Sequence, residues 1–166
     1  MFCLLAQRGR MVLFVLFAVQ LAAPAQAREG WFGSDQPGKT GIFYGEIPPT
    51  GEPANDEMIH ISLNCNKSRD AIYVLLSESS KQLKPNKSVR VTISAAGVSS
   101  SAMGKTLPNE LAGIPSLEIL LPLDAAVLRA MLNASSLTIR VDTWKSTTTL
   151  QGIAGRLKAL LKACSK

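Results

Sequence analysis

Hydrophobic and polar residues alternate along most of the chain beyond residue 57, as expected for β-strands that bury one face. The clearest alternating or apolar runs cover residues 59–65, 71–76, 88–94, 117–121 and 137–144. Four polar residues, 66–69, separate the first two runs and predict a hairpin. Residues 97–105 fit either a loop or an edge strand, and residues 145–150 fit either a turn or a paired strand. This part of the chain is therefore expected to be mostly β.

Two segments change to the helical period. Residues 125–132 place Val127 and Met131 on one face, and Asp124 is the expected N-cap. Residues 153–164 form a second amphipathic pattern near the end of the chain. We therefore expect a mainly β fold of the α+β class. It is an antiparallel β-sandwich or curled sheet of about six to eight strands, with one short inserted helix and a C-terminal helix packed on it.

Residues 28–56 are rich in glycine and proline, which cost entropy to order and bury little surface. We expect an irregular N-terminal arm there, interrupted by one short strand at residues 41–47. Trp31 and Phe32 are expected to pin this arm to the domain, and the alternative is that they face a ligand. Residues 57–166 are then a single β-rich domain with a C-terminal helix.

The first 27 residues carry the features of a secretory signal peptide. Two arginines precede an apolar stretch at residues 11–19, and an Ala-Gln-Ala cleavage site ends at Ala27. A transmembrane anchor is the alternative, but it requires about 20 apolar residues, and Pro24 ends this apolar segment early. We expect cleavage after Ala27, no stable membrane anchor afterwards, and a periplasmic or secreted protein.

The charge balance changes when this segment is set aside. The whole chain has 18 basic and 12 acidic residues, a net charge of +6. Residues 1–27 contain two of the basic residues and none of the acidic ones, so the remaining chain has 16 against 12, or +4. The basic residues are scattered among acidic ones and form no dense stripe interleaved with aromatic residues. Nucleic acid is therefore not an expected partner.

Without residues 1–27 the chain keeps two cysteines, Cys65 and Cys164. An oxidising compartment favours one disulfide between them. The disulfide would close a loop of 100 residues, for which chain entropy gives an upper figure of about 4.7 kcal/mol of stabilisation. The alternatives are two free thiols or a metal site, but His60 is the only histidine that is present as a further ligand. We expect no metal and no cofactor.

Two sequence features resemble nucleotide-binding or catalytic motifs. The Gly-Lys-Thr of residues 104–106 matches the end of a phosphate-binding loop, but Ser99 stands where the first glycine is required and Pro108 breaks the helix that should follow. We therefore expect no nucleotide. His60 is the only imidazole base, and the chain has no Gly-x-Ser-x-Gly elbow and no Ser-x-x-Lys pair. The sequence predicts no catalytic residue.

Six residues are candidate surface contacts for a partner: Trp31, Phe32, Trp144, Arg156, Lys158 and Lys162. Large aromatic side chains often act as anchors. The three basic residues lie on the polar side of the C-terminal amphipathic segment, where they either contact anionic lipid or a partner or form an ordinary solvated helix face. An exposed apolar patch around the aromatic residues favours binding, whereas a deep polar cleft with His60 and a carboxylate favours an enzyme.

The expected order of elements is a signal peptide, a strand ending in Leu63-Asn64-Cys65, a strand pair at residues 137–150, and a helix ending at Cys164. This arrangement is similar to that of small exported proteins of Gram-negative bacteria, some of them associated with type VI secretion. The resemblance implies a compact β-rich periplasmic domain with a strand-to-helix disulfide, and it transfers no catalytic residue.

We therefore expect a non-enzymatic periplasmic binding or accessory protein that acts through its surface, with an envelope protein as its candidate partner. The runner-up is a small cell-envelope hydrolase or an inhibitor of an envelope enzyme. A third alternative is an envelope protein whose only role is structural stability.

Overall fold

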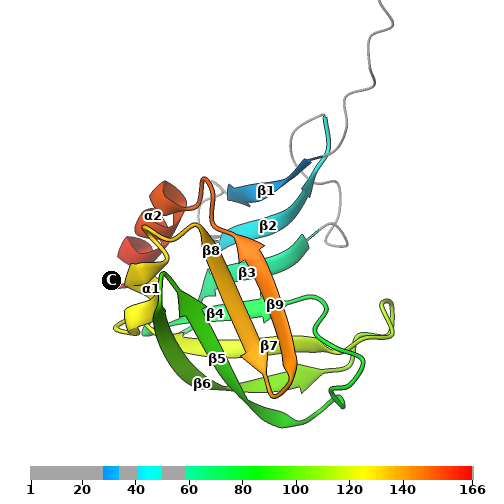
Figure 1. The fold of residues 1–166 in the computed structure, drawn as a ribbon. Coiled ribbons are helices and arrows are strands. Elements are labelled where there is room, and N and C mark those ends of the chain that lie inside the picture. Colours follow the sequence, from blue (N-terminus) through cyan, green and yellow to red (C-terminus); the bar gives the residue numbers. More distant parts are fainter. Residues whose placement is uncertain (1–27, 34–40, 50–58, 166) are drawn as a thin grey trace, which may run out of the picture.

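The computed structural model describes residues 28–33, 41–49 and 59–165, which form nine strands and two helices (Figure 1). In chain order the elements are β1 (Arg28–Gly33), β2 (Gly41–Ile47), β3 (Ile59–Cys65), β4 (Ala71–Leu76), β5 (Ser88–Ala95), β6 (Val98–Leu107), β7 (Ser116–Pro122), α1 (Ala126–Ala130), β8 (Ser136–Val141), β9 (Trp144–Thr149) and α2 (Ala154–Cys164). The signal peptide predicted for residues 1–27 lies outside the described residues and stays a prediction.

All nine strands belong to one antiparallel sheet with the order β1-β2-β3-β4-β7-β6-β5-β8-β9. The sheet curls until it is nearly closed, and β1 and β9 are its two edges (Figure 1). The mainly β fold of the α+β class is confirmed, and of the two expected architectures the protein has the curled sheet. The expected hairpin of β3 and β4 and the expected strand at residues 41–47 are both present.

Three strands differ from the sequence expectation, which explains why the sheet exceeds six to eight strands. β1 is a regular strand paired with β2, in place of irregular chain. The serine-rich β6 lies inside the sheet between β5 and β7, so it is neither a loop nor an edge. The run at residues 137–144 turns at Asp142, whose φ is +50°, and β9 begins at Trp144. Alternation stays in phase across this tight turn, so periodicity alone does not reveal it.

The inner face of the curled sheet holds the hydrophobic core. Alternate residues of β4 and β7 are buried there, among them Ile72, Val74, Leu117 and Ile119. Both helices lie at the same end of the curled sheet (Figure 1). The buried residues that the helices add to the core are Val127, Leu128, Leu157, Leu160 and Cys164. The two periods of the sequence therefore determine which side of each element faces the core.

The predicted disulfide joins Cys65 and Cys164, with an S–S distance of 2.09 Å and a Cα–Cα distance of 5.4 Å. Cys65 is the last residue of β3 and Cys164 is the last residue of α2. Each cysteine lies in phase with the apolar positions of its own element. The bridge therefore fastens the end of α2 to the sheet that the helix covers.

The start of α1 differs from the expected cap. Asp124 is not the N-cap, because the helix begins at Ala126 and its N-cap residue is Ala125, which has no capping side chain. The N–H of Val127 in the first turn donates to the hydroxyl of Ser100 in β6 at 3.4 Å. The N–H of Ala125 donates to the carbonyl oxygen of Pro122, so a backbone turn leads from β7 into the helix. The carbonyl oxygen of Asp124 accepts a hydrogen bond from Arg129.

The Gly-Lys-Thr segment lies inside β6. Gly104 is buried, and a Cβ atom there would lie 2.7 Å from a methyl carbon of Val91. Thr106 is fully buried; its hydroxyl donates to the carbonyl oxygen of Lys84 at 2.6 Å and accepts from the N–H of Lys87 at 2.9 Å. These residues pack a strand and hold the loop before β5, so they do not have the loop-to-helix geometry that cradles a phosphate.

Candidate functional site

The aromatic residues of β1 point to opposite faces of the sheet. Trp31 is only 5% exposed and packs against Tyr44, with ring centroids 5.2 Å apart. Its indole Nε1–H donates a 2.6 Å hydrogen bond to the carbonyl oxygen of Thr149 in β9. Trp31 is therefore not the surface contact that the sequence offered as a candidate, because its side chain connects the two edge strands from inside.

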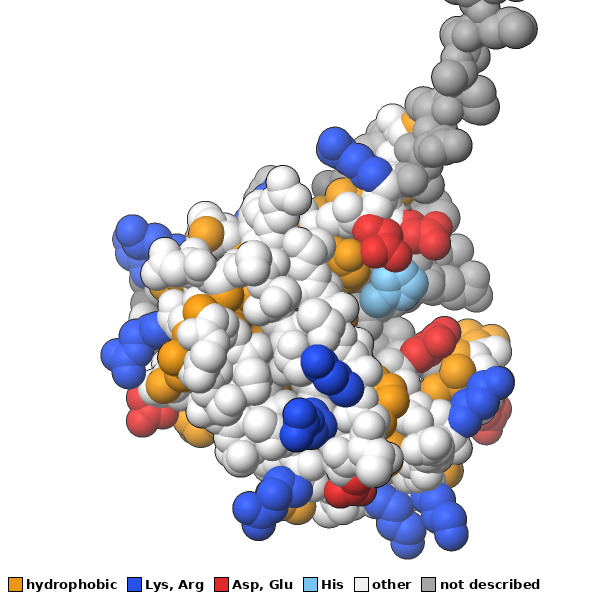
Figure 2. Space-filling model, in the orientation of Figure 1, with side chains coloured by type: hydrophobic (Ala, Val, Ile, Leu, Met, Phe, Trp, Pro, Cys, Tyr) orange, Lys and Arg blue, Asp and Glu red, His pale blue; other side chains and the backbone are white. Residues whose placement is uncertain are grey.

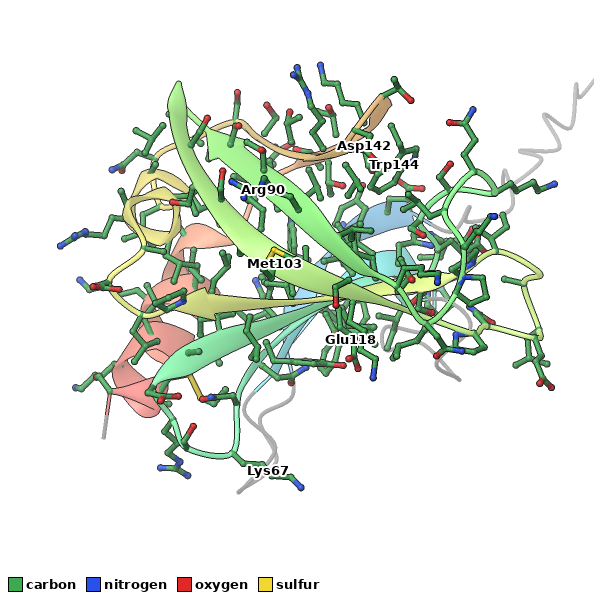
Figure 3. All side chains as sticks on the ribbon, turned by 90° about the horizontal axis from the view of Figure 1, so that it is seen from below. Lys67, Arg90, Met103, Glu118, Asp142 and Trp144 are labelled. Carbon is green, nitrogen blue, oxygen red and sulfur yellow. A yellow bond between two sulfur atoms is a disulfide. The ribbon has the colours of Figure 1, made fainter. Side chains whose placement is uncertain are left out.

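Phe32 lies on the outer face, where it stacks on Phe43 of β2 with ring centroids 5.6 Å apart. Further apolar and aromatic side chains continue across the outer face of β4, β7 and β6. We call this set the outer apolar strip: Phe32, Phe43, Tyr73, Leu75, Leu120 and Met103. Leu120 and Met103 are 52% and 60% exposed, and Figure 3 shows Met103 on this face from below. Within the described residues neither helix covers the strip, since both pack on the core side of the sheet.

The strand register sets the members of the outer apolar strip on neighbouring strands, with Ser62 between Phe43 and Leu75. Phe43 pairs with Ser62, and Ser62 pairs with Leu75 on its other side. Tyr73 in turn pairs with Leu120. The sequence places Ser62 on a polar strand face, yet the residue is only 7% exposed. Its apolar neighbours come from adjacent strands, which the periodicity of one strand does not reveal.

A carboxylate lies within the outer apolar strip. The hydroxyl of Tyr73 donates a hydrogen bond to the carboxylate of Glu118. Burial, followed by this hydrogen bond and the negative charge of Glu118, raises the pKa of Tyr73 well above its usual value of 10. Lys105 pairs with Glu118 on the other side, across the β6–β7 ladder. The strip therefore combines aromatic surface with one fixed acceptor of hydrogen bonds.

Trp144 begins β9 and is paired with Val141 across the tight turn at Asp142. Figure 3 shows Asp142 and Trp144 close together at this turn. Its side chain is partly buried against the core. It therefore lies on the inner side of the sheet, whereas Phe32 lies on the outer side. The structure does not bring the three aromatic candidates together on one surface.

The three basic candidates of α2 do not form one patch either. Arg156 lies along β1, since a Cβ atom added to Gly33 would be 3.6 Å from its Cδ atom, and its guanidinium donates to the carbonyl oxygen of Gly152 at 3.3 Å. Lys158 and Lys162 are one helical turn apart and exposed, on the side of α2 opposite its buried residues. All three residues are exposed, and Arg156 differs from the two lysines in lying beside the end of β1.

A group of titratable side chains lies at the end of the sheet where β1 and β3 begin. The hydroxyl of Tyr44 donates a 2.7 Å hydrogen bond to Oε2 of Glu29, and its ring centroid lies 6.5 Å from that of His60. Burial, followed by the hydrogen bond and charge of Glu29, raises the pKa of Tyr44 to about 12. In Figure 2 the histidine adjoins acidic side chains, and the surface beside them is hollowed. The phenol of Tyr44 therefore keeps its proton at neutral pH.

The sequence pointed to His60 but not to its neighbours. Glu29 belongs to the part of the N-terminal arm that was expected to be irregular, whereas Tyr44 belongs to the strand expected at residues 41–47, and only the pairing of β1 with β2 places them beside each other. The same ladder sets Glu29 directly opposite Glu46. The sequence signal for this strand is that Glu29 and Trp31 are two residues apart, the spacing of one strand face. The run is too short and too rich in glycine to predict a strand.

Two further findings concern the described residues as a whole. Among them, no group of three or more histidine, cysteine, aspartate or glutamate side chains is arranged to hold a metal ion. No helix in the described ranges has the length and apolar character needed to cross a membrane.

The fold and these surfaces define a β-rich protein of the α+β class. Its curled nine-stranded antiparallel sheet is joined to its C-terminal helix by a disulfide. Comparison with protein families, with curated proteins and with solved structures found no match to this chain.

Proposed function

We propose that this chain is an exported, non-enzymatic binding or accessory protein of the bacterial cell envelope, and that it holds a protein partner on its outer apolar strip. The observation that carries the proposal is the strip itself, a row of apolar and aromatic side chains on an outer sheet face that is interrupted by the buried Ser62. Exposed apolar patches of this kind commonly mark interaction sites.

The composition of the strip suits a protein partner. Aromatic residues and methionine are enriched in the centres of protein interfaces. Phe32 and Phe43 offer two stacked rings, and Met103 offers a flexible side chain that adapts to the shape of a partner. The Tyr73–Glu118 hydrogen bond gives the partner a polar group to recognise beside the apolar surface.

Two features support export. Residues 1–27 have the order of regions typical of a signal peptide. The disulfide between Cys65 and Cys164 is of the kind that persists in oxidising compartments. We therefore place the protein in the periplasm or outside the cell.

An envelope hydrolase, or an inhibitor of an envelope enzyme, is the second candidate. It is favoured by one observation, the proximity of Glu29, Tyr44 and His60 beside a surface hollow (Figure 2). The high pKa of Tyr44 argues against a role for its phenol as a base or nucleophile at neutral pH. A hydrolytic activity of the purified protein that His60→Ala abolishes would replace the binding proposal with this one.

The binding proposal is tested by capture of partners from envelope extract with the tagged exported protein. Leu120→Ser and Met103→Ser each remove apolar surface from the strip, and both side chains are more than half exposed, so the core stays intact. Leu111→Ser is the matched control, because Leu111 is 89% exposed and lies in the turn between β6 and β7, outside the strip. Unfolding curves of all variants confirm that each one is folded.

We expect the wild-type protein and Leu111→Ser to capture the same partner, and the two strip variants to lose most of it. Equal capture by all variants would show that the partner binds elsewhere. Absence of any specific partner of the wild-type protein contradicts the proposed function.

A further inference from the structure

The last strand of the sheet presents backbone hydrogen-bonding groups along its outer edge. Leu150 donates its N–H to the carbonyl oxygen of Ser135. Together with the register of β8 and β9, this bond identifies which residue pairs of the ladder are hydrogen-bonded. In an antiparallel ladder, hydrogen-bonded pairs alternate with pairs whose backbone groups point away from each other. Lys145, Thr147 and Thr149 are therefore the residues of β9 whose N–H and C=O groups point away from β8.

The hydrogen bond from Trp31 agrees with this assignment, because its acceptor is the carbonyl oxygen of Thr149, which points away from β8. No described strand pairs with this edge, since β9 is the last strand in the order of the sheet. The N–H and C=O groups of Lys145 and Thr147, together with the N–H of Thr149, lie along the outer edge of β9, and Trp31 joins the Thr149 end of this edge to β1 across the seam between the two strands. The edge of β9 therefore has a row of donors and acceptors in the spacing of a β-strand.

We propose that the edge of β9 binds an extended peptide segment of a partner protein, which joins the sheet as a further strand at the seam. Strand addition takes its affinity from main-chain hydrogen bonds and its specificity from alternate side chains. This site is separate from the outer apolar strip, so the inference goes beyond the proposed function.

The edge of β9 lacks the usual protection against strand addition. Proteins commonly protect exposed edges with prolines, β-bulges or charged side chains. Residues 144–149 contain no proline, and their ladder with β8 runs from Trp144 to Thr149 without a shift of register. Lys145 is the single charged residue, and the rest of the strand after it is serine and threonine.

Near the point where Trp31 meets β9, β1 carries acidic side chains that favour a basic peptide. Glu29 of β1 lies directly opposite Glu46 of β2, and both are exposed. Like charges in this arrangement cost stability, and a cation from a partner relieves the cost. Trp31, which bridges the seam, is two residues from Glu29, so both side chains point to the same side of β1. We therefore assign the peptide a lysine or arginine that reaches Glu29.

The direct test titrates a synthetic capped peptide into the isotopically labelled, exported form of the chain and follows amide exchange by NMR. The probe alternates valine and threonine and has one central lysine. The backbone N–H groups of Lys145, Thr147 and Thr149 should exchange with solvent about tenfold more slowly once the peptide is bound. The N–H of Ser146 already bonds to β8 and should change little. A peptide with glutamate in place of lysine should bind more weakly.

Two variants at one position separate strand addition from other modes of binding. Thr147→Pro removes an outward N–H that β8 does not use, which an edge strand tolerates. Thr147→Val keeps this N–H. Both variants lose the contact between the hydroxyls of Thr147 and Thr138, so they are matched in that respect. We expect Thr147→Pro to abolish peptide binding and Thr147→Val to bind as the wild type does, with both variants folded.

Peptide binding that survives Thr147→Pro overturns the inference, as does protection that appears only on the outer apolar strip or on α2. Protection of β9 that rises with protein concentration and needs no peptide would show instead that two copies of the chain pair through this edge. If no peptide protects β9 while the strip variants still lose their partner, this inference fails and the proposed function stands.

Discussion

Trp31 donates a hydrogen bond through its indole nitrogen to the carbonyl oxygen of Thr149, which is 118 residues away and belongs to the strand at the opposite edge of the sheet. No ladder connects β1 to β9 within the described residues. The bond, together with the packing of Trp31 on Tyr44, joins the edges where backbone pairing does not. The curl of the sheet is therefore secured by a side chain.

Replacing Trp31 with phenylalanine keeps an aromatic ring but removes the donor. We expect Trp31→Phe to lower the free energy of unfolding by about 1 kcal/mol for the lost hydrogen bond, with a further loss from the smaller ring. Trp31→Ala should cost about 3–5 kcal/mol, because the residue is buried in the core. Urea unfolding measures both variants. A Trp31→Phe protein as stable as the wild type would show that the seam does not depend on this bond.

Reduction of the disulfide should destabilise the protein strongly. Cys65 and Cys164 are 99 positions apart, so the unfolded chain regains the freedom of a long loop, and the loss is up to about 4.7 kcal/mol. Melting temperatures with and without reductant, and the mass after alkylation of free thiols, provide the measurement. The double replacement of both cysteines by serine should melt with the reduced protein. Identical mass and melting temperature under both conditions would contradict the bridge.

Replacement by alanine should change the free energy of unfolding in opposite directions at Gly104 and Gly155. A Cβ atom at Gly104 would lie 2.7 Å from Val91 and 3.0 Å from the backbone oxygen of Glu118. Gly104→Ala should therefore lower the free energy of unfolding by about 1–3 kcal/mol. Gly155→Ala in α2 meets no atom within 4 Å and should raise it by up to about 1 kcal/mol, because alanine favours the helix. Thermal or chemical unfolding of the two variants distinguishes these outcomes; equal effects would be inconsistent with the packing of β6.

Stability should decline in alkali because of Tyr44. Its folded pKa is raised to about 12, whereas the unfolded value is about 10. The contribution is fully present below about pH 10 and is lost as the pH rises towards 12, since the unfolded chain ionises first. Unfolding experiments across this range, with tyrosinate absorbance as a second measure, should show a shallower decline for Tyr44→Phe. The pKa of Tyr73 is also raised. The same measurements on Tyr73→Phe therefore separate the contributions of the two tyrosines. A wild-type profile identical to that of Tyr44→Phe would refute the shift.

Local pattern was sufficient for much of the fold. The alternation in β3 and in β5, the helical period of α2 and the positions of the two cysteines each follow from residues close together in the chain. Predictions from periodicity and capping residues failed where the local structure depends on contacts with elements that are distant in the sequence. The sequence suggested Asp124 as an N-cap, but the N-cap residue is Ala125, and the N–H of Val127 donates to the hydroxyl of Ser100 on a distant strand. It treated β1 as irregular, because a six-residue strand among glycines is stable only when paired with β2.

For the candidate surfaces too, the sequence indicated single residues, and the tertiary structure decided which of them lie together. Phe32 could be selected as a large aromatic residue, but its neighbours in the outer apolar strip come from strands that are distant in sequence. Trp31 could be selected for the same reason, and it turned out to be internal, since adjacent strand residues face opposite sides. Arg156 and Lys158 are both exposed on the same helix, yet only Arg156 lies beside the end of β1 among the contacts of the described residues.

The sequence by itself determined the β-rich class, the buried side of each well-patterned strand and the disulfide between Cys65 and Cys164, because period, composition and cysteine count are local or global properties of one chain. Only the tertiary structure decided that the sheet curls into one layer, that Trp31 closes it on Thr149, and which outer side chains lie on neighbouring strands. Strand order and register depend on contacts between distant residues, and no local pattern encodes them.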